Sequence, residues 1–187
     1  MPASTAITEF RAFRDRIDAL TREAWELYKG QMACKKGCSA CCRGDFNITV
    51  LEGWTLKAAV DTLPEATRTR IAENLKNLSP ERCPLLLDDA CSVYAERPVL
   101  CRVFGFPVSS GQAIATCELN FTEAQASGMD LSARCFNQPA IAESLEAFSR
   151  LWLVEQGYAV PPEATLPVVT VAQAIQQDSG SVAAMTT

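Results

Sequence analysis

The sequence predicts a mainly α-helical protein with small β-hairpins, in which amphipathic helices pack around an irregular core rich in cysteine. Three observations support this fold class. Apolar residues recur every three or four positions in residues 5–29 and 139–157, which is the periodicity of one helix face. Short apolar runs separated by turn residues lie between these two segments. The 187 residues include nine cysteines and no histidine, and most of the cysteines fall in the irregular stretches.

Residues 5–29 are predicted to form a long amphipathic helix that Gly30 ends. Its apolar stripe is expected to contain Phe10, Phe13, Ile17, Leu20, Ala24 and Leu27. The seven-residue spacing is compatible with a coiled-coil seam but covers few heptads. We therefore expect the helix to lie on the core of its own domain. Docking of a protein partner through this helix is the alternative.

Two further helices are expected between residues 49 and 78. Thr49 followed three positions later by Glu52 has the spacing of a capping box, so a helix should start there and run to about residue 63. Pro64 suits the first turn of the next helix. The apolar side of that helix is expected to be Ile71, Leu75 and Leu78.

Two short hairpins are predicted between residues 83 and 117. The first has Asp88 and Asp89 at its turn, which makes Cys83 and Cys91 candidate cross-strand neighbours. One helical turn is expected to start at Pro98. The second hairpin covers residues 104–117, and residues 118–138 are expected to be irregular.

The C-terminal part contains one more strong helix, which Pro139 opens and which should end near Gly157. Its apolar face is expected to be Ile141, Leu145, Phe148, Leu151 and Trp152. Residues 161–162 are interpreted as a linker, 166–177 as a short helix and 178–187 as a disordered tail. The predicted organisation is an N-terminal helix (1–29), a cysteine-cluster domain (30–160) that includes the helix 139–157, and a C-terminal linker, helix and tail (161–187).

The composition of the chain argues against several classes of function. The net charge of -5 and the isoelectric point of about 4.9 predict no binding to nucleic acid and no attraction to an anionic membrane. No apolar run reaches the ~18 residues of a membrane span, and the first residues lack the pattern of a secretory signal. A cysteine-rich chain of this kind is expected in the reducing cytoplasm. The lack of histidine excludes mixed cysteine–histidine zinc sites, Ser-His-Asp triads and Cys-His dyads.

Four cysteines fall within nine residues, with the spacing C-x3-C-x2-C-C: they are Cys34, Cys38, Cys41 and Cys42. Thiolates are soft ligands that favour zinc, copper(I) and iron–sulfur clusters. A turn with cysteines two to four residues apart presents them on one side of a bend, which fits the first three. The side chains of Cys41 and Cys42 should point in different directions, so one of them should either serve a second site or support the first site from outside its set of ligands.

The other half of the site is expected from Cys83, Cys91, Cys101 and Cys117. Four plus four thiolates suffice for two tetrathiolate sites, or for one iron–sulfur cluster and one zinc site. The cysteine-rich core is therefore predicted to bind Zn²⁺ or iron. Cys135 is left over and is expected to be a buried structural thiol. The basic residues that could offset excess negative charge at the thiolates, or else be solvated, are Lys35, Lys36, Arg43, Arg97 and Arg102.

Two ordered blocks of residues resemble the YkgJ-type cysteine-cluster family, the CxxCxxCC zinc- or iron-chelating domain. They are Cys34-x3-Cys38-x2-Cys41-Cys42 and, later, Cys83-Pro84-Leu85-Leu86, Cys91-Ser92-Val93-Tyr94, Arg97-Pro98 and Cys101-Arg102-Val103-Phe104. The match covers roughly residues 30–120. The spacing between its first two cysteines, C-x3-C, is one residue longer than the C-x2-C in the family's name. The resemblance implies metal chelation by the eight cysteines and supplies no reaction.

Two classes of enzyme share part of this pattern. Radical S-adenosylmethionine enzymes hold a cluster with C-x3-C-x2-C, but the long helix before the motif and the missing alternation of strands and helices argue against that fold. A similar cysteine domain occurs in flagellin lysine N-methylases, which are believed to hold an iron–sulfur cluster. This chain looks too short to be one of those enzymes.

The expected function is that of a cytoplasmic metal-binding protein whose zinc or iron is structural or carried, because closed tetrathiolate sites leave no open coordination position. The alternative is an iron–sulfur redox protein or an accessory factor to a protein-modifying enzyme. The metal ion is the expected partner, with neither nucleic acid nor membrane. A protein partner would bind through the N-terminal helix.

Overall fold

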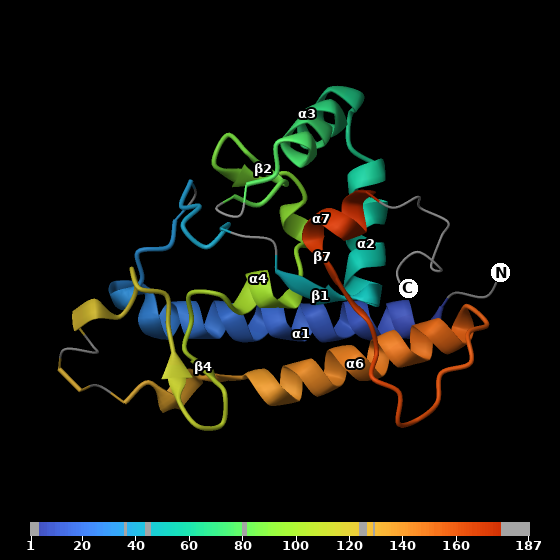
Figure 1. The fold of residues 1–187 in the computed structure, drawn as a ribbon. Coiled ribbons are helices and arrows are strands. Elements are labelled where there is room, and N and C mark those ends of the chain that lie inside the picture. Colours follow the sequence, from blue (N-terminus) through green and yellow to red (C-terminus); the bar gives the residue numbers. More distant parts are fainter. Residues whose placement is uncertain are drawn as a thin grey trace.

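The computed structural model describes residues 4–35, 37–43, 46–79, 82–123, 127–128 and 130–176, and it confirms a mainly α fold with small β elements (Figure 1). The helices are α1 (Thr5–Tyr28), α2 (Val50–Asp61), α3 (Glu65–Lys76), α4 (Val99–Val103), α6 (Gln138–Glu155) and α7 (Val171–Gln176). The strands are β1 (Asn47–Thr49), β2 (Leu86–Leu87), β3 (Ala90–Cys91), β4 (Val108–Ser109), β5 (Ile114–Ala115), β6 (Phe136–Asn137) and β7 (Val168–Thr170).

The two longest helices form the base of the molecule. α1 and α6 lie side by side and antiparallel, so that the start of α1 meets the end of α6 (Figure 1). At this junction Ser4 Oγ donates a hydrogen bond of 2.5 Å to Glu155 Oε2. Midway along the pair, the ring centroids of Phe13 and Phe148 are 5.5 Å apart. α1 therefore packs on the core of its own chain, and docking of a protein partner through it gains no support.

The buried stripe of α1 differs from the predicted one. It consists of Ala6, Phe10, Arg14, Ile17, Thr21, Ala24 and Tyr28. Leu20 and Leu27 are instead 44% and 57% exposed. The two stripes share positions 10, 17 and 24, so periodicity alone does not choose between them. Arg14 shows why the observed stripe is stable. Its guanidinium pairs with Glu96 and lies over the Phe10 ring, so the buried charge is compensated.

α1 and α3 end at residues that differ from the predicted ends. α1 ends at Tyr28, and Gly30 lies in a short 3₁₀ turn (Lys29–Gln31) rather than forming a left-handed stop. α3 starts after Pro64, as expected, and buries Ile71. Leu78 lies beyond the end of α3 and is 43% exposed, because the helix closes two residues earlier than its apolar spacing indicates.

Above the base, α2 and α7 pack against each other and against a two-stranded sheet. The capping box is confirmed: Thr49 Oγ1 accepts from Glu52 N, and Glu52 Oε2 accepts from Thr49 N at 3.1 Å. β1 pairs antiparallel with β7, a strand that was missed because residues 166–177 were expected to be helical throughout. Gly53 makes the close approach possible, since a Cβ there would lie 2.9 Å from Val169 Cγ2.

Both predicted hairpins are present but shorter than expected. β2 and β3 are joined by Asp88 and Asp89, whose φ values of 51° and 56° suit short polar residues. Cys91 lies opposite Leu86, so the prediction that Cys83 and Cys91 are cross-strand neighbours is wrong. The register explains this, because only two residues of each strand are paired and Cys83 precedes them.

The second hairpin, β4–β5, is extended by a strand from the segment expected to be irregular. β6 pairs in parallel with β4, with Phe136 opposite Val108. The chain then enters α6 at once, because the Asn137 side chain accepts a hydrogen bond of 3.0 Å from Ala140 N and caps the helix. β6 therefore fixes where α6 begins.

One apolar core cluster contains side chains from Ala6 to Ile175. Trp152 of α6 is fully buried, and its ring centroid lies 5.6 Å from that of Trp54 on α2. Leu151, expected in the core, is 40% exposed, and Ser149 is buried instead. No helix in the described part of the chain is both long and apolar enough to cross a membrane. The predicted disordered tail, 178–187, lies outside the described residues.

Candidate metal centre

The first four cysteines lie in a loop that follows α1. Two tight turns shape it: Cys38 N donates to Lys35 O and Cys42 N donates to Ser39 O, each at 2.9 Å. Gly37 has a φ of +88°, a left-handed conformation that glycine adopts without strain. The consecutive turns hold the four cysteines of this loop in a compact stretch of chain.

The second set of cysteines comes from separate elements. Cys83 precedes β2, Cys91 ends β3, Cys101 lies on α4 and Cys117 follows β5. Cys83 N donates a hydrogen bond of 2.9 Å to Cys42 O, which joins the two halves of the site through the main chain. At the hairpin turn, Ser39 Oγ donates to Asp89 Oδ1 at 3.3 Å. The first loop therefore lies against the β2–β3 hairpin.

The cysteines that neighbour Cys34 differ from those that neighbour Cys42 and Cys101, and this difference divides the cysteines into two groups. Burial raises the pKa of Cys34, and so do the nearby thiols of Cys38, Cys117 and Cys41. We call Cys34, Cys38 and Cys117 the Cys34 group. A hydrogen bond to Cys41, burial, and the neighbouring thiols of Cys83 and Cys101 raise the pKa of Cys42. We call Cys42, Cys83, Cys91 and Cys101 the Cys101 group, because Cys91 and Cys83 both raise the pKa of Cys101.

Cys41 acts on thiols of both groups. It also contacts Cys42, although adjacent residues were expected to point apart. The hydrogen bond between the two side chains lowers the pKa of Cys41 and raises that of Cys42. The contact therefore favours the charged form of Cys41 and the neutral form of Cys42. The tight turn that ends the loop, rather than regular helix or strand, accounts for this contact.

All eight cysteines are half-buried and none is in a disulfide. In the described part of the chain, no three cysteine, aspartate or glutamate side chains are placed so that they could hold a metal ion as they stand. The two groups are therefore sets of neighbouring thiols and not finished coordination spheres. Closing either sphere requires a shift of side chains or of the loop.

Comparison with protein-family models matches residues 33–126 to CxxCxxCC, described as "Putative zinc- or iron-chelating domain". The match covers half of the chain and includes the seven cysteines of the two groups and Cys41. The chain belongs to the CxxCxxCC family. Comparisons with curated proteins and with solved structures give no match.

The ninth cysteine of this CxxCxxCC member lies apart from the two groups. Cys135 precedes β6, and burial is the cause that raises its pKa. It is half-buried and not fully buried as expected, because its sulfur lies at the sheet edge, 3.9 Å from Phe136 O. Cys135 is therefore a suitable control residue for experiments on the other eight.

Asn120 is a polar residue of the centre that sequence reasoning missed. It is 1% exposed. Its Nδ2 donates to Cys34 Sγ at 3.3 Å and to Gly105 O at 2.8 Å, and its Oδ1 accepts from Ala33 N at 2.9 Å. A donor to a thiolate stabilises the charged form, and this bond lowers the pKa of Cys34 against the effect of burial. Nothing in the sequence around Asn120 distinguishes it from the other asparagines.

Gly105 is required where Cys34 and Asn120 meet. Its φ of +97° is left-handed. A Cβ at this position would lie 3.1 Å from both Cys34 Sγ and Asn120 Nδ2. The backbone of residue 105 therefore approaches the thiol more closely than a residue with a side chain allows.

Glu52 supports the Cys101 group from a distance. Glu52 is 4% exposed, and both oxygens of its carboxylate accept hydrogen bonds. Oε2 accepts from Thr49 N, and Oε1 accepts from Val99 N at 2.9 Å. Val99 is the first residue of α4, the helix that carries Cys101. Burial raises the pKa of Glu52, and these hydrogen bonds counteract that rise. One side chain thus caps two helices.

The basic residues near the cysteines have different roles. Arg97 lies 3.9 Å from the centroid of the Tyr94 ring, and its charge lowers the pKa of Cys91. Arg102 is 5% exposed and points away to α1, where it pairs with Asp18 at 2.5 Å. Lys36 lies outside the described residues. Arg97 therefore offsets thiolate charge, whereas Arg102 anchors α4 on α1.

Proposed function

We propose that this CxxCxxCC chain binds zinc or iron through eight thiolates, those of Cys34, Cys38, Cys41, Cys42, Cys83, Cys91, Cys101 and Cys117. The observation that carries the proposal is the proximity of eight half-buried thiols, in which neighbouring cysteines raise the pKa of Cys34, Cys42 and Cys101. Such mutual repulsion is relieved when a cation binds the deprotonated sulfurs. Soft sulfur donors without histidine are suited to zinc or to iron–sulfur chemistry.

The ligands would divide into two sets of four. The Cys101 group supplies four thiols by itself, and Cys41 would complete the Cys34 group. Four sulfur ligands suit the tetrahedral preference of zinc and also the coordination of iron–sulfur clusters. A closed sphere of this type leaves no position for a substrate, so the metal would be structural or carried. Free thiols of this kind persist in reducing compartments, which favours the cytoplasm.

The second candidate is an iron–sulfur redox protein or an accessory factor to a protein-modifying enzyme. The hydrogen bond from Asn120 to Cys34 favours it, because donors to cluster sulfurs are one of the ways in which proteins set cluster potentials. Protein purified without oxygen separates the two candidates. A brown protein with visible absorption and bound iron and sulfide supports the cluster, and a colourless protein with bound zinc supports the first proposal.

The ligand assignment is tested by metal analysis of serine variants. Cys38→Ser removes a thiol from the Cys34 group and Cys91→Ser removes one from the Cys101 group. Each variant is expected to lose roughly half of the metal, because four thiolates hold one centre. The double variant is expected to lose nearly all of it.

Cys135→Ser is the matched control and should keep the metal content of the unmodified protein. Unchanged metal in both single variants would refute the assignment of these cysteines. Complete loss in each single variant would show instead that all eight thiols hold one joint centre.

A further inference from the structure

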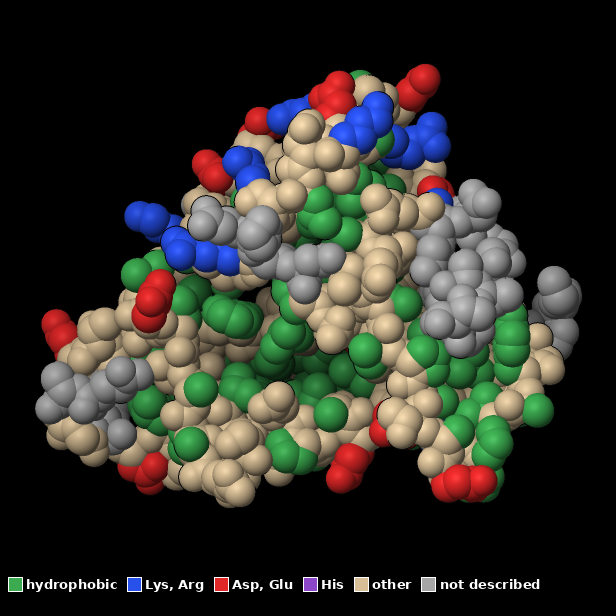
Figure 2. Space-filling model, viewed as in Figure 1, with side chains coloured by type: hydrophobic (Ala, Val, Ile, Leu, Met, Phe, Trp, Pro, Cys, Tyr) green, Lys and Arg blue, Asp and Glu red, His purple; other side chains and the backbone are tan. Residues whose placement is uncertain are grey.

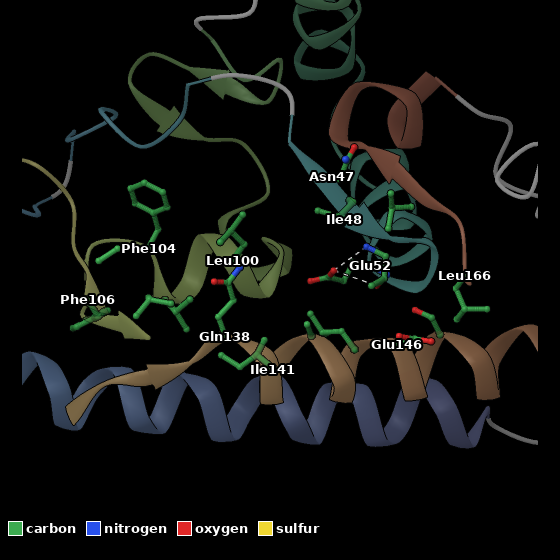
Figure 3. Close-up of a pocket in the computed structure, with 18 of the residues that line it drawn as sticks. Asn47, Ile48, Glu52, Leu100, Phe104, Phe106, Gln138, Ile141, Glu146 and Leu166 are labelled. Carbon is green, nitrogen blue, oxygen red and sulfur yellow. Dashed lines mark hydrogen bonds between the residues drawn. The ribbon is translucent and has the colours of Figure 1, made fainter. Parts of the chain in front are cut away.

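An apolar groove of about 610 Å³ lies between α6, α4 and the β1–β7 sheet. Figure 2 shows it as a hollow lined with hydrophobic side chains across the middle of this face. In Figure 3, Leu100 and Phe104 line one side, and Ile141 rises from α6 below. Leu100 and Phe104 are 41% and 43% exposed, so the apolar surface continues to the mouth of the groove.

The floor of the groove follows one face of α6. The helix contributes Gln138, Ile141, Ala142, Leu145, Glu146 and Ser149. These positions recur at three- and four-residue steps, so they form a continuous stripe. Eleven residues of helix separate the first from the last, which corresponds to about 16 Å. The groove is therefore elongated and has room for an alkyl chain or a comparable apolar body.

Two buried polar groups lie in the groove wall. Ser149 is 1% exposed, and its hydroxyl has no hydrogen-bond partner among the described residues. A buried hydroxyl without a partner is costly, so a ligand that supplies one is favoured. Glu52 points into the groove from α2 (Figure 3). It accepts three hydrogen bonds, from Thr49 N, Thr49 Oγ1 and Val99 N, and a carboxylate has about four acceptor sites.

The charge of the lining selects against anions. Glu52 and Glu146 are its carboxylates, and no lysine or arginine occurs among the described residues that line the groove, since Arg150, which pairs with Glu146 at 3.1 Å, lies outside the lining. A bound carboxylate or phosphate would lack a cationic partner and would face like charge. An alcohol or an amine can instead donate a hydrogen bond to a carboxylate oxygen and pair with the Ser149 hydroxyl.

We propose that the groove binds an apolar molecule with a hydrogen-bond-donating, non-anionic head group, a primary alcohol or a primary amine. The apolar body lies along α6, and the head group reaches Ser149 and Glu52. Cys117 of the Cys34 group also lines the groove, so its occupant lies next to the candidate metal centre. The proposal goes beyond metal binding and does not depend on it.

The test uses three probes with the same eight-carbon body: 1-octanol, octylamine and octanoate. Binding to the protein as purified without oxygen is measured by calorimetry below the concentration at which each probe self-associates. Octanol and octylamine are expected to bind, and octanoate is expected to bind at least about tenfold more weakly, since its charge would be buried unpaired. Tighter binding of octylamine than octanol would identify the amine as the preferred head group.

Two pairs of variants locate the site. Ala142→Trp fills the groove and should abolish binding, whereas Ala147→Trp adds the same side chain at an exposed position of α6 outside the lining and should not. Ser149→Ala should weaken binding of the alcohol about tenfold, because its head group loses a buried partner. Ser144→Ala is the control, since the Ser144 hydroxyl already bonds to Ala140 O at 2.8 Å.

The proposal is overturned if none of the probes binds, if octanoate binds as well as octanol, or if Ala142→Trp and Ala147→Trp behave alike. Circular dichroism of each variant confirms that it is folded before binding is compared. Metal content is measured on the same samples, so that loss of metal and loss of probe binding are seen separately.

Discussion

Asn120 shows how one buried side chain can organise the cysteines around it. Its amide joins the loop that follows α1, through Ala33 and Cys34, to the turn at Gly105. The backbone around it adds a second link, because Asn120 N donates to Cys117 O at 2.9 Å. Two members of the Cys34 group are therefore held by one residue, and the third, Cys38, follows Cys34 in the same loop.

We expect Asn120→Ala to lower the free energy of unfolding by roughly 1–3 kcal/mol, because the buried Gly105 carbonyl loses its partner. Urea denaturation of the protein with its metal measures this change. Asn77→Ala is the matched control, since Asn77 is exposed, and it should stay within about 0.5 kcal/mol. Asn120→Asp should bind metal more weakly than Asn120→Ala, because it adds negative charge beside Cys34. Equal effects of Asn120→Ala and Asn77→Ala would contradict this role.

The sequence predicts the eight candidate ligands from spacing and residue type alone. It does not predict Asn120, because an asparagine has no distinctive pattern until three distant segments meet at it. The same limit applies to Ser149, a small polar residue on an apolar helix face. Residues whose role follows from their own chemistry are visible in a sequence, and those whose role follows from their neighbours are not.

At the scale of elements, Glu52 links the start of α2 to the start of α4. The part within α2 is local, because Thr49 and Glu52 lie three residues apart, and the sequence predicts it. The part that reaches Val99 spans 47 positions and depends on how α4 docks. The helix that carries Cys101 is therefore positioned by a residue of another helix.

We expect Glu52→Ala to lower the free energy of unfolding by roughly 2–4 kcal/mol, because it removes a helix cap and leaves the buried Val99 N–H without an acceptor. Thr49→Ala removes the cap of α2 alone and should cost about 1 kcal/mol. Equilibrium unfolding measures both. Metal analysis should show a loss from the Cys101 group in Glu52→Ala and little change in Thr49→Ala. If the two variants are equally stable and retain equal metal, the link to α4 is unimportant.

The strands differ in whether their pairing can be predicted from nearby residues. Asp88 and Asp89 mark the β2–β3 turn in the sequence, so this hairpin is predicted. β6 and β7 are missed because each pairs with a strand far away in the chain, β4 and β1. Two or three residues of strand carry too little periodicity for pairing of this kind to be read from the sequence.

At the scale of the whole molecule, two sources of stability are spatially distinct. The core is built mainly from α1, α2, α6 and α7, whose buried side chains include Phe10, Leu56, Trp152 and Val171. The cysteines lie instead in loops, a two-residue hairpin and the five-residue helix α4. Each of these short elements adds only a few side chains to the core, such as Leu85, Val99 and Val103, so their order also depends on caps, on ion pairs such as Asp18–Arg102 and, in our proposal, on metal.

Removing the metal should therefore loosen one part of the molecule and leave the other folded. After treatment with a chelator under reducing conditions, we expect far-ultraviolet circular dichroism to change little, because the long helices keep their core. Amide hydrogen exchange should become faster in residues 33–43 and 83–117 and stay slow in α1 and α6. A chain with Cys38→Ser and Cys91→Ser should show the same exchange pattern without chelator, and Cys135→Ser should not. Fast exchange in α1 and α6 as well would mean that the metal holds the entire fold, as in small domains that are unfolded without metal.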